Sequence, residues 1–125
     1  YREHAVHQLV VLAPEAEEAA LQAILADHGG RYRAVRSHAS AVDVFHADGS
    51  KARGIRRVCA ALGVPLDETM AFGDGLNDVE MFKTVGYGVA MGDAVPEPRA
   101  LAQYQTGTVE EDGIYTALQH LGIIA

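Results

Sequence analysis

Residues 69–78 have the sequence Thr-Met-Ala-Phe-Gly-Asp-Gly-Leu-Asn-Asp, and they carry the clearest structural signal in the chain. An apolar run stops at Gly73, and Asp74, Asn77 and Asp78 follow within five residues. Three apolar residues at helical spacing come next: Val79, Phe82 and Val85. The pattern predicts a buried strand, a polar turn and a helix, which is the local signature of an α/β fold.

The polar turn has the composition of a ligand site. In open α/β sheets, ligands bind outside the carboxyl ends of the strands. Two carboxylates and an amide beside glycines that permit close backbone approach suit a hard cation such as Mg²⁺ together with a bound phosphate. The simpler alternative is an ordinary acidic turn in which Asn77 is the N-cap of the helix.

A second candidate group lies upstream, in a predicted amphipathic helix over residues 50–62. Ser50 is a suitable N-cap, and Gly63 is a suitable end. The apolar face consists of Ile55, Val58, Cys59 and Leu62. Lys51 then falls in the first turn, where the helix dipole disfavours a cation, so it is a candidate for neutralising a bound anion. The alternative is a solvated lysine that extends the basic face formed by Arg53, Arg56 and Arg57.

The lysine helix, the link Gly-Val-Pro-Leu-Asp at 63–67 and Gly-Asp-Gly-Leu-Asn-Asp at 73–78 together resemble the haloacid dehalogenase (HAD) superfamily. More narrowly they resemble its Cof-type phosphatases. Residues 88–94, Gly-Val-Ala-Met-Gly-Asp-Ala, are similar to the next strand and turn of that family, with Asp93 where the family usually has Asn. The resemblance runs in order through residues 50–124.

This resemblance implies a Mg²⁺-dependent phosphoryl-transfer site that acts on a small phosphorylated metabolite, such as a sugar phosphate. Asp74 would be a direct metal ligand. Asp78 would hold metal-bound water or orient Lys51. Asn77 would donate its amide to the substrate phosphate, and Lys51 would pair with the phosphate and the attacking carboxylate. The native metal could equally be Mn²⁺.

The family's nucleophile motif, Asp-x-Asp-Gly-Thr/Ser, does not occur in the 125 residues. The nearest string, residues 44–50, has His46 at the nucleophile position, and we interpret it as a coincidence in preference to a phosphohistidine site. We therefore expect the chain to be the C-terminal part of a larger phosphatase and to be inactive alone. Two alternatives are a standalone, non-catalytic module that holds Mg²⁺ or phosphate, and an enzyme whose nucleophile strand comes from a separate chain.

Before residue 48 the pattern changes. We predict a strand at 5–12, a helix at 14–28 and two strands at 31–37 and 40–47. This β-α-β-β order resembles the second half of the α/β cap of Cof-type enzymes. The predicted chain is thus α/β, with residues 1–48 as the C-terminal part of a cap and residues 49–125 as the C-terminal part of a Rossmann-like core.

The composition of the chain argues against several classes of binding partner. The net charge of −7 argues against binding to nucleic acid or to an anionic membrane surface. No apolar run approaches the ~18 residues that a membrane span needs. The single cysteine, Cys59, excludes an internal disulfide and favours a cytoplasmic location.

The missing nucleophile strand has a structural consequence. In the fold of the family that this chain resembles, the nucleophile strand lies beside the strand that corresponds to the one ending at Gly73. Without it, residues 69–72 would expose an unpaired apolar edge, so we expect self-association of the isolated chain.

Overall fold

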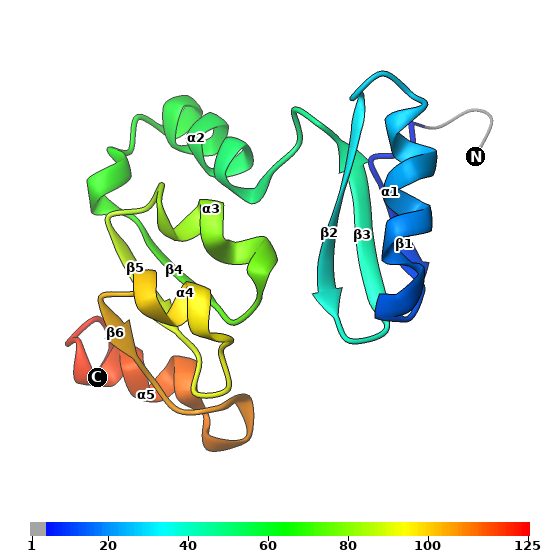
Figure 1. Ribbon diagram of the computed structural model, residues 1–125. Coiled ribbons are helices and arrows are strands. Elements are labelled where there is room, and N and C mark those ends of the chain that lie inside the picture. The colour runs from blue at the N-terminus through cyan, green and yellow to red at the C-terminus, as the bar shows by residue number, and fades with distance from the viewer. Residues whose placement is uncertain (1–4) are drawn as a thin grey trace. The chain divides into compact units, whose positions relative to one another are not determined.

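The computed structural model describes residues 5–125, and the fold is mixed α/β. The chain divides into two compact units, which meet in sequence between Ser50 and Lys51 (Figure 1). The boundary predicted near Asp48 and Gly49 lies within two residues of this division.

Within residues 5–50, the first unit is a three-stranded antiparallel sheet with one α-helix (Figure 1). Its elements are β1 (Gln8–Leu12), a 3-10 turn (Glu15–Glu17), α1 (Glu18–Ala26), β2 (Tyr32–His38) and β3 (Ala41–His46). The strand order is β1-β3-β2, and Val42 and Val44 of the central strand are buried. The β-α-β-β order agrees with the prediction, although β1 begins three residues later and the 3-10 turn replaces the start of the predicted helix.

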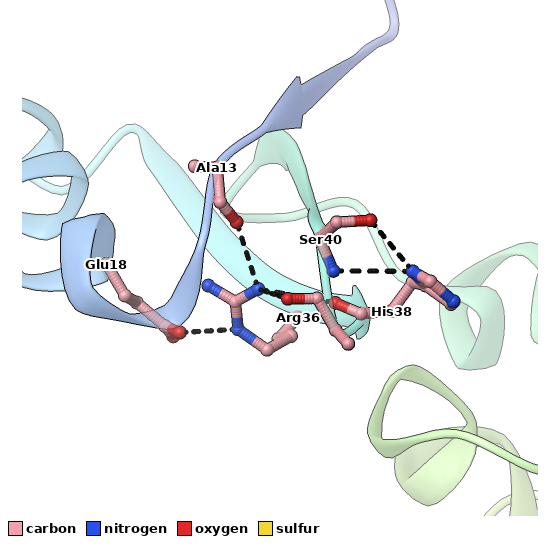
Figure 2. Close-up of polar contacts among 6 residues, drawn as sticks. Ala13, Glu18, Arg36, His38 and Ser40 are labelled. Carbon is pink, nitrogen blue, oxygen red and sulfur yellow. Dashed lines mark hydrogen bonds and ion pairs between the residues drawn. The ribbon is translucent and has the colours of Figure 1, made fainter.

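Arg36 of β2 ties the parts of this unit together (Figure 2). Its Nε donates to Glu18 Oε2 at the start of α1, at 2.8 Å. Its Nη1 donates to the carbonyl of Ala13 at 3.2 Å, and to those of His38 and Ala39 in the β2–β3 hairpin at 3.3 and 3.1 Å. One side chain therefore links the helix, the end of β1 and the hairpin.

The second unit is built on a three-stranded parallel sheet of order β4-β5-β6. The strands are β4 (Met70–Gly73), β5 (Tyr87–Ala90) and β6 (Tyr104–Gln105). The helices are α2 (Lys51–Leu62), α3 (Val79–Phe82), α4 (Pro96–Leu101) and α5 (Gly113–His120). Short 3-10 turns cover Leu66–Glu68, Leu76–Asp78 and Val109–Glu111. A parallel sheet with helical crossovers is the arrangement expected for a Rossmann-like core.

The core of this unit forms where α3 and α4 meet the sheet. The buried cluster consists of Met81, Phe82, Ala90 and Ala94. Val85 packs against it, as the helical spacing after Asp78 predicts. The helix is nevertheless short and ends at Phe82. Four residues later the chain passes Gly86, whose backbone lies so close to Asp67 that an added Cβ would be 2.1 Å from the Asp67 carbonyl oxygen.

The apolar face of α2 is only partly buried. Cys59 is buried, and Ile55 packs against the core cluster. The prediction was wrong for Val58 and Leu62, which are 57% and 71% exposed. Within residues 5–125, no helix combines the length and the apolar character that crossing a bilayer demands.

Candidate functional site

The candidate site lies where β4 ends. Because β4, β5 and β6 are parallel, their carboxyl ends lie at one edge of the sheet. The 3-10 turn Leu76–Asp78 follows β4 at that edge and leads directly into α3. This is the position at which ligands bind in open α/β sheets.

Asp78 is the centre of the loop after β4. It is 2% exposed, and its Oδ2 accepts hydrogen bonds from the backbone N–H groups of Asp74 at 3.0 Å and Gly75 at 3.2 Å. The Asp78 N–H in turn donates to the Gly75 carbonyl at 3.0 Å, which is the backbone hydrogen bond of the 3-10 turn. The alternative with Asn77 as N-cap is wrong, since Gly75 occupies that position and Asn77 lies inside the turn.

Lys51 reaches the same carboxylate from α2. Its Nζ forms an ion pair with Asp78 Oδ1 across 27 positions of sequence. The Lys51 side chain is 49% exposed and that of Asp78 is 3% exposed, so a solvent-facing ammonium is anchored to a buried carboxylate. The structure thus places the lysine of the first turn of α2 beside the loop that carries Asp74.

The approach of Asp78 depends on Gly73, one of the glycines that the sequence identified as permitting close approach, although its contact with Asp78 was not predicted. A Cβ on Gly73 would lie 2.7 Å from Asp78 Oδ2 and 2.8 Å from Asp78 Cβ. Any larger residue would push the Asp78 side chain out of place. The signal was present in the sequence, because a glycine ends the apolar strand directly before Asp74.

The side chains of Asp74 and Asn77 are available to a ligand. Asp74 is exposed and Asn77 is half-buried. Within residues 5–125, neither side chain forms a hydrogen bond or an ion pair. The backbone of Asp74 is held, because its carbonyl accepts from the Val95 N–H at 2.9 Å. The backbone that carries the Asp74 carboxylate is therefore held in place, and the carboxylate itself is free to bind.

This donor set fits part of a magnesium shell. Asp74 can coordinate directly, whereas both oxygens of Asp78 are already engaged by Lys51 and two N–H groups. Among residues 5–125 there is no group of three or more His, Cys, Asp or Glu side chains that could enclose a metal. Mg²⁺ is commonly held by one or two carboxylates and completed by waters and phosphate oxygens, so a single free carboxylate is compatible with it.

His46 lies in the other unit, at the end of β3. It is exposed, and its Nδ1 accepts a hydrogen bond from the Asp48 N–H at 3.2 Å. It belongs to the first unit, whereas Lys51, Asp74, Asn77 and Asp78 belong to the second.

Comparison with known proteins adds independent information. The family model for haloacid dehalogenase-like hydrolases matches residues 1–118. The putative phosphatase YkrA of Bacillus subtilis (strain 168) is 41% identical over 124 residues, which cover 99% of this chain and 46% of that protein. The chain thus spans about half the length of this curated relative.

Two solved structures show the same fold. The HAD subclass IIB sugar phosphatase BT4131 is similar with a TM-score of 0.82 and 35% identity, covering 98% of this chain and 45% of that chain. The HAD superfamily phosphatase BT1666 from Bacteroides thetaiotaomicron has a TM-score of 0.82 and 36% identity, covering 98% of this chain and 44% of that chain.

Proposed function

The chain belongs to the haloacid dehalogenase-like hydrolases, and on this premise we propose that it forms part of a Mg²⁺-dependent phosphatase of small phosphomonoesters. The observation that carries the proposal is the position of Asp78, whose carboxylate holds the Lys51 ammonium and the backbone of the Asp74 loop together. That arrangement puts a cation and a free carboxylate at one end of β4.

Each residue has a defined task in this proposal. The Lys51 ammonium neutralises charge on the phosphate and on the attacking carboxylate, and Asn77 donates its amide to a phosphate oxygen. Asp78 acts as a positioning residue, because its oxygens are used in holding Lys51 and the loop. In phosphoryl transfer the protein contributes mainly positioning and charge stabilisation, which is what this set of side chains offers.

Asp74 would hold the metal, with Mn²⁺ as an alternative to Mg²⁺. Its carboxylate is exposed, free of partners and anchored through its backbone. When bound, the divalent ion would neutralise charge that develops on the transferring phosphoryl group. Because this chain offers one free carboxylate there, further oxygen ligands would come from water, from the phosphate and from groups outside the 125 residues.

The nucleophile is also proposed to lie outside these residues. The reaction would pass through an aspartyl-phosphate, in which a carboxylate oxygen attacks phosphorus, the alcohol leaves, and water then hydrolyses the acyl phosphate. No Asp-x-Asp-Gly motif is present in the chain to supply that carboxylate. The isolated chain would therefore be inert.

The proposed substrate class is based on the relatives, and the net charge of the chain bears on the partners that it excludes. BT4131 is named as a sugar phosphatase, and we extend sugar phosphates to this chain as the expected class. Residues 1–48 would form part of a cap that selects the leaving group. The net charge of −7 makes nucleic acid an unsuitable partner, and we propose a cytoplasmic site of action.

Hydrolysis of p-nitrophenyl phosphate with Mg²⁺ tests the proposal. The assay would be run on this chain and on a longer protein in which a segment with the nucleophile motif precedes it. We expect an active longer protein, its loss of activity in Asp74→Asn, and an inert isolated chain. Hydrolysis by the verified 125-residue chain would refute the missing nucleophile, and a longer protein without phosphatase activity would refute the function itself.

A further inference from the structure

A second loop crosses the end of β4 beside Asp74. Residues 91–95 follow β5, the neighbour of β4 in the parallel sheet. The Met91 N–H donates to the Gly73 carbonyl at 3.0 Å, and the Val95 N–H donates to the Asp74 carbonyl at 2.9 Å. Both ends of this loop are therefore attached to the backbone that carries the Asp74 carboxylate.

The loop is held from its other side as well. The Gly92 N–H donates to the Gly107 carbonyl at 3.0 Å, and a Cβ on Gly92 would lie 2.7 Å from the Thr108 nitrogen. From α4, Arg99 Nη2 donates to the carbonyls of Gly92 at 3.1 Å and Ala94 at 2.8 Å. Contacts on both sides fix the backbone on either side of residue 93.

Asp93 sits in the middle of this fixed loop. It is exposed, and within residues 5–125 its carboxylate forms no hydrogen bond or ion pair. Arg99 donates to the two carbonyls that flank Asp93, and within residues 5–125 it forms no ion pair with the Asp93 carboxylate. The edge of the sheet at which Asp74 lies thus carries a second carboxylate that has no ion-pair partner among the described residues.

We propose that Asp93 acts on the cation site at Asp74 through space, and that its charge strengthens the binding of a divalent cation there. This inference rests on the proposed function, because it presupposes that Asp74 is a cation ligand. Neighbouring strands lie roughly 5 Å apart, which puts the two loops within a range where charges still interact in water. For a doubly charged cation, loss of one such carboxylate weakens binding about three- to tenfold at low salt.

Mn²⁺ binding to the longer protein that includes the segment with the nucleophile motif, measured from the electron paramagnetic resonance signal of free Mn²⁺, tests this role without an activity assay. The variant Asp93→Asn removes the charge and keeps the shape. The matched control is Asp67→Asn, which makes the same change at an exposed residue just before β4, at the opposite end of that strand. Both variants would be titrated at low and high KCl.

We expect Asp93→Asn to raise the Kd for Mn²⁺ about three- to tenfold at low salt, with a smaller effect at high salt because exposed charges are screened. Asp67→Asn should bind as the unmodified longer protein does. An unchanged Kd in Asp93→Asn, or an equal change in Asp67→Asn, would overturn the role of Asp93. Mn²⁺ binding that is absent, or unaffected by Asp74→Asn, would refute the cation site of the proposed function and this inference together.

Discussion

Lys51 and Asp78 form an ion pair between a half-exposed ammonium and an almost fully buried carboxylate. The second oxygen of Asp78 accepts from the N–H groups of Asp74 and Gly75. One carboxylate therefore fixes both the first turn of α2 and the loop after β4. A change at Asp78 disturbs the positions of Lys51 and Asp74 at the same time.

The first prediction concerns stability at Asp78. In Asp78→Asn the amide has one acceptor oxygen where the carboxylate has two, so either Lys51 or the loop N–H groups lose their partner. We expect a loss of about 2–4 kcal/mol in the free energy of unfolding, because the groups left unpaired are buried or charged. Urea denaturation measures it. The control Asp67→Asn at an exposed site should stay within about 0.5 kcal/mol, and an equal loss in both variants would show that Asp78 is no anchor.

The second prediction is that replacing Lys51 lowers activity far more than it lowers stability. Lys51→Met should lower the free energy of unfolding by only about 1–2 kcal/mol, because Asp78 keeps its two N–H partners. Phosphatase activity of the longer protein should fall at least about 100-fold, since a charge that stabilises the transition state is removed. Arg57→Met, at another exposed cation of α2, provides the control. If both variants lost activity equally, the role of Lys51 would reduce to that of an ordinary surface charge.

The third prediction compares two glycine-to-alanine substitutions, which should change the stability of the chain in opposite directions. Gly73→Ala forces a Cβ against Asp78 and should destabilise the chain by about 1–3 kcal/mol. Gly54 lies inside α2 with no heavy atom within 4 Å of an added Cβ, so Gly54→Ala should stabilise by about 0.5–1 kcal/mol. Thermal unfolding of the two variants measures the difference. A neutral Gly73→Ala would mean that Asp78 moves aside freely.

The Arg36 contacts predict a local effect in the first unit. Arg36→Met removes donors to Glu18 and to three carbonyls, and should lower the local opening free energy by about 2–3 kcal/mol. Hydrogen exchange should rise in β2 and β3 while amides of β4 and β5 stay protected. The matched control is Arg31→Met, at an exposed position just before β2. Unchanged protection in the β2–β3 hairpin would show that the Arg36 contacts do not stabilise this unit.

The elements that the sequence predicted are those with local signals. Periodicity and end signals fixed the helix over residues 51–62, and the apolar run fixed the strand that ends at Gly73. Helical spacing did not foresee that Val58 and Leu62 stay exposed, because burial depends on what the rest of the fold places over a helix.

The internal geometry of the site could be predicted from the sequence only in part. The acidic turn and Lys51 could be identified as candidates from residue type and position. The double engagement of Asp78 depends on the close approach permitted by Gly73 and on a partner 27 residues away. The contact of Arg99 with the loop at 91–95 likewise has no local signal, since a basic residue near the end of a helix is explained by the dipole alone.

The last prediction is self-association of the isolated chain through unpaired strand edges. Among residues 5–125, β4 pairs only with β5 and β1 pairs only with β3. β1 also exposes Leu9, Val10 and Leu12, at 56%, 61% and 80%. An apolar edge with free backbone groups is a template for another strand, so light scattering should show a mass that rises with concentration. Leu12→Lys should suppress the increase if β1 is the edge used and leave it if β4 is. A monomer at every concentration tested would show that neither edge recruits a second copy.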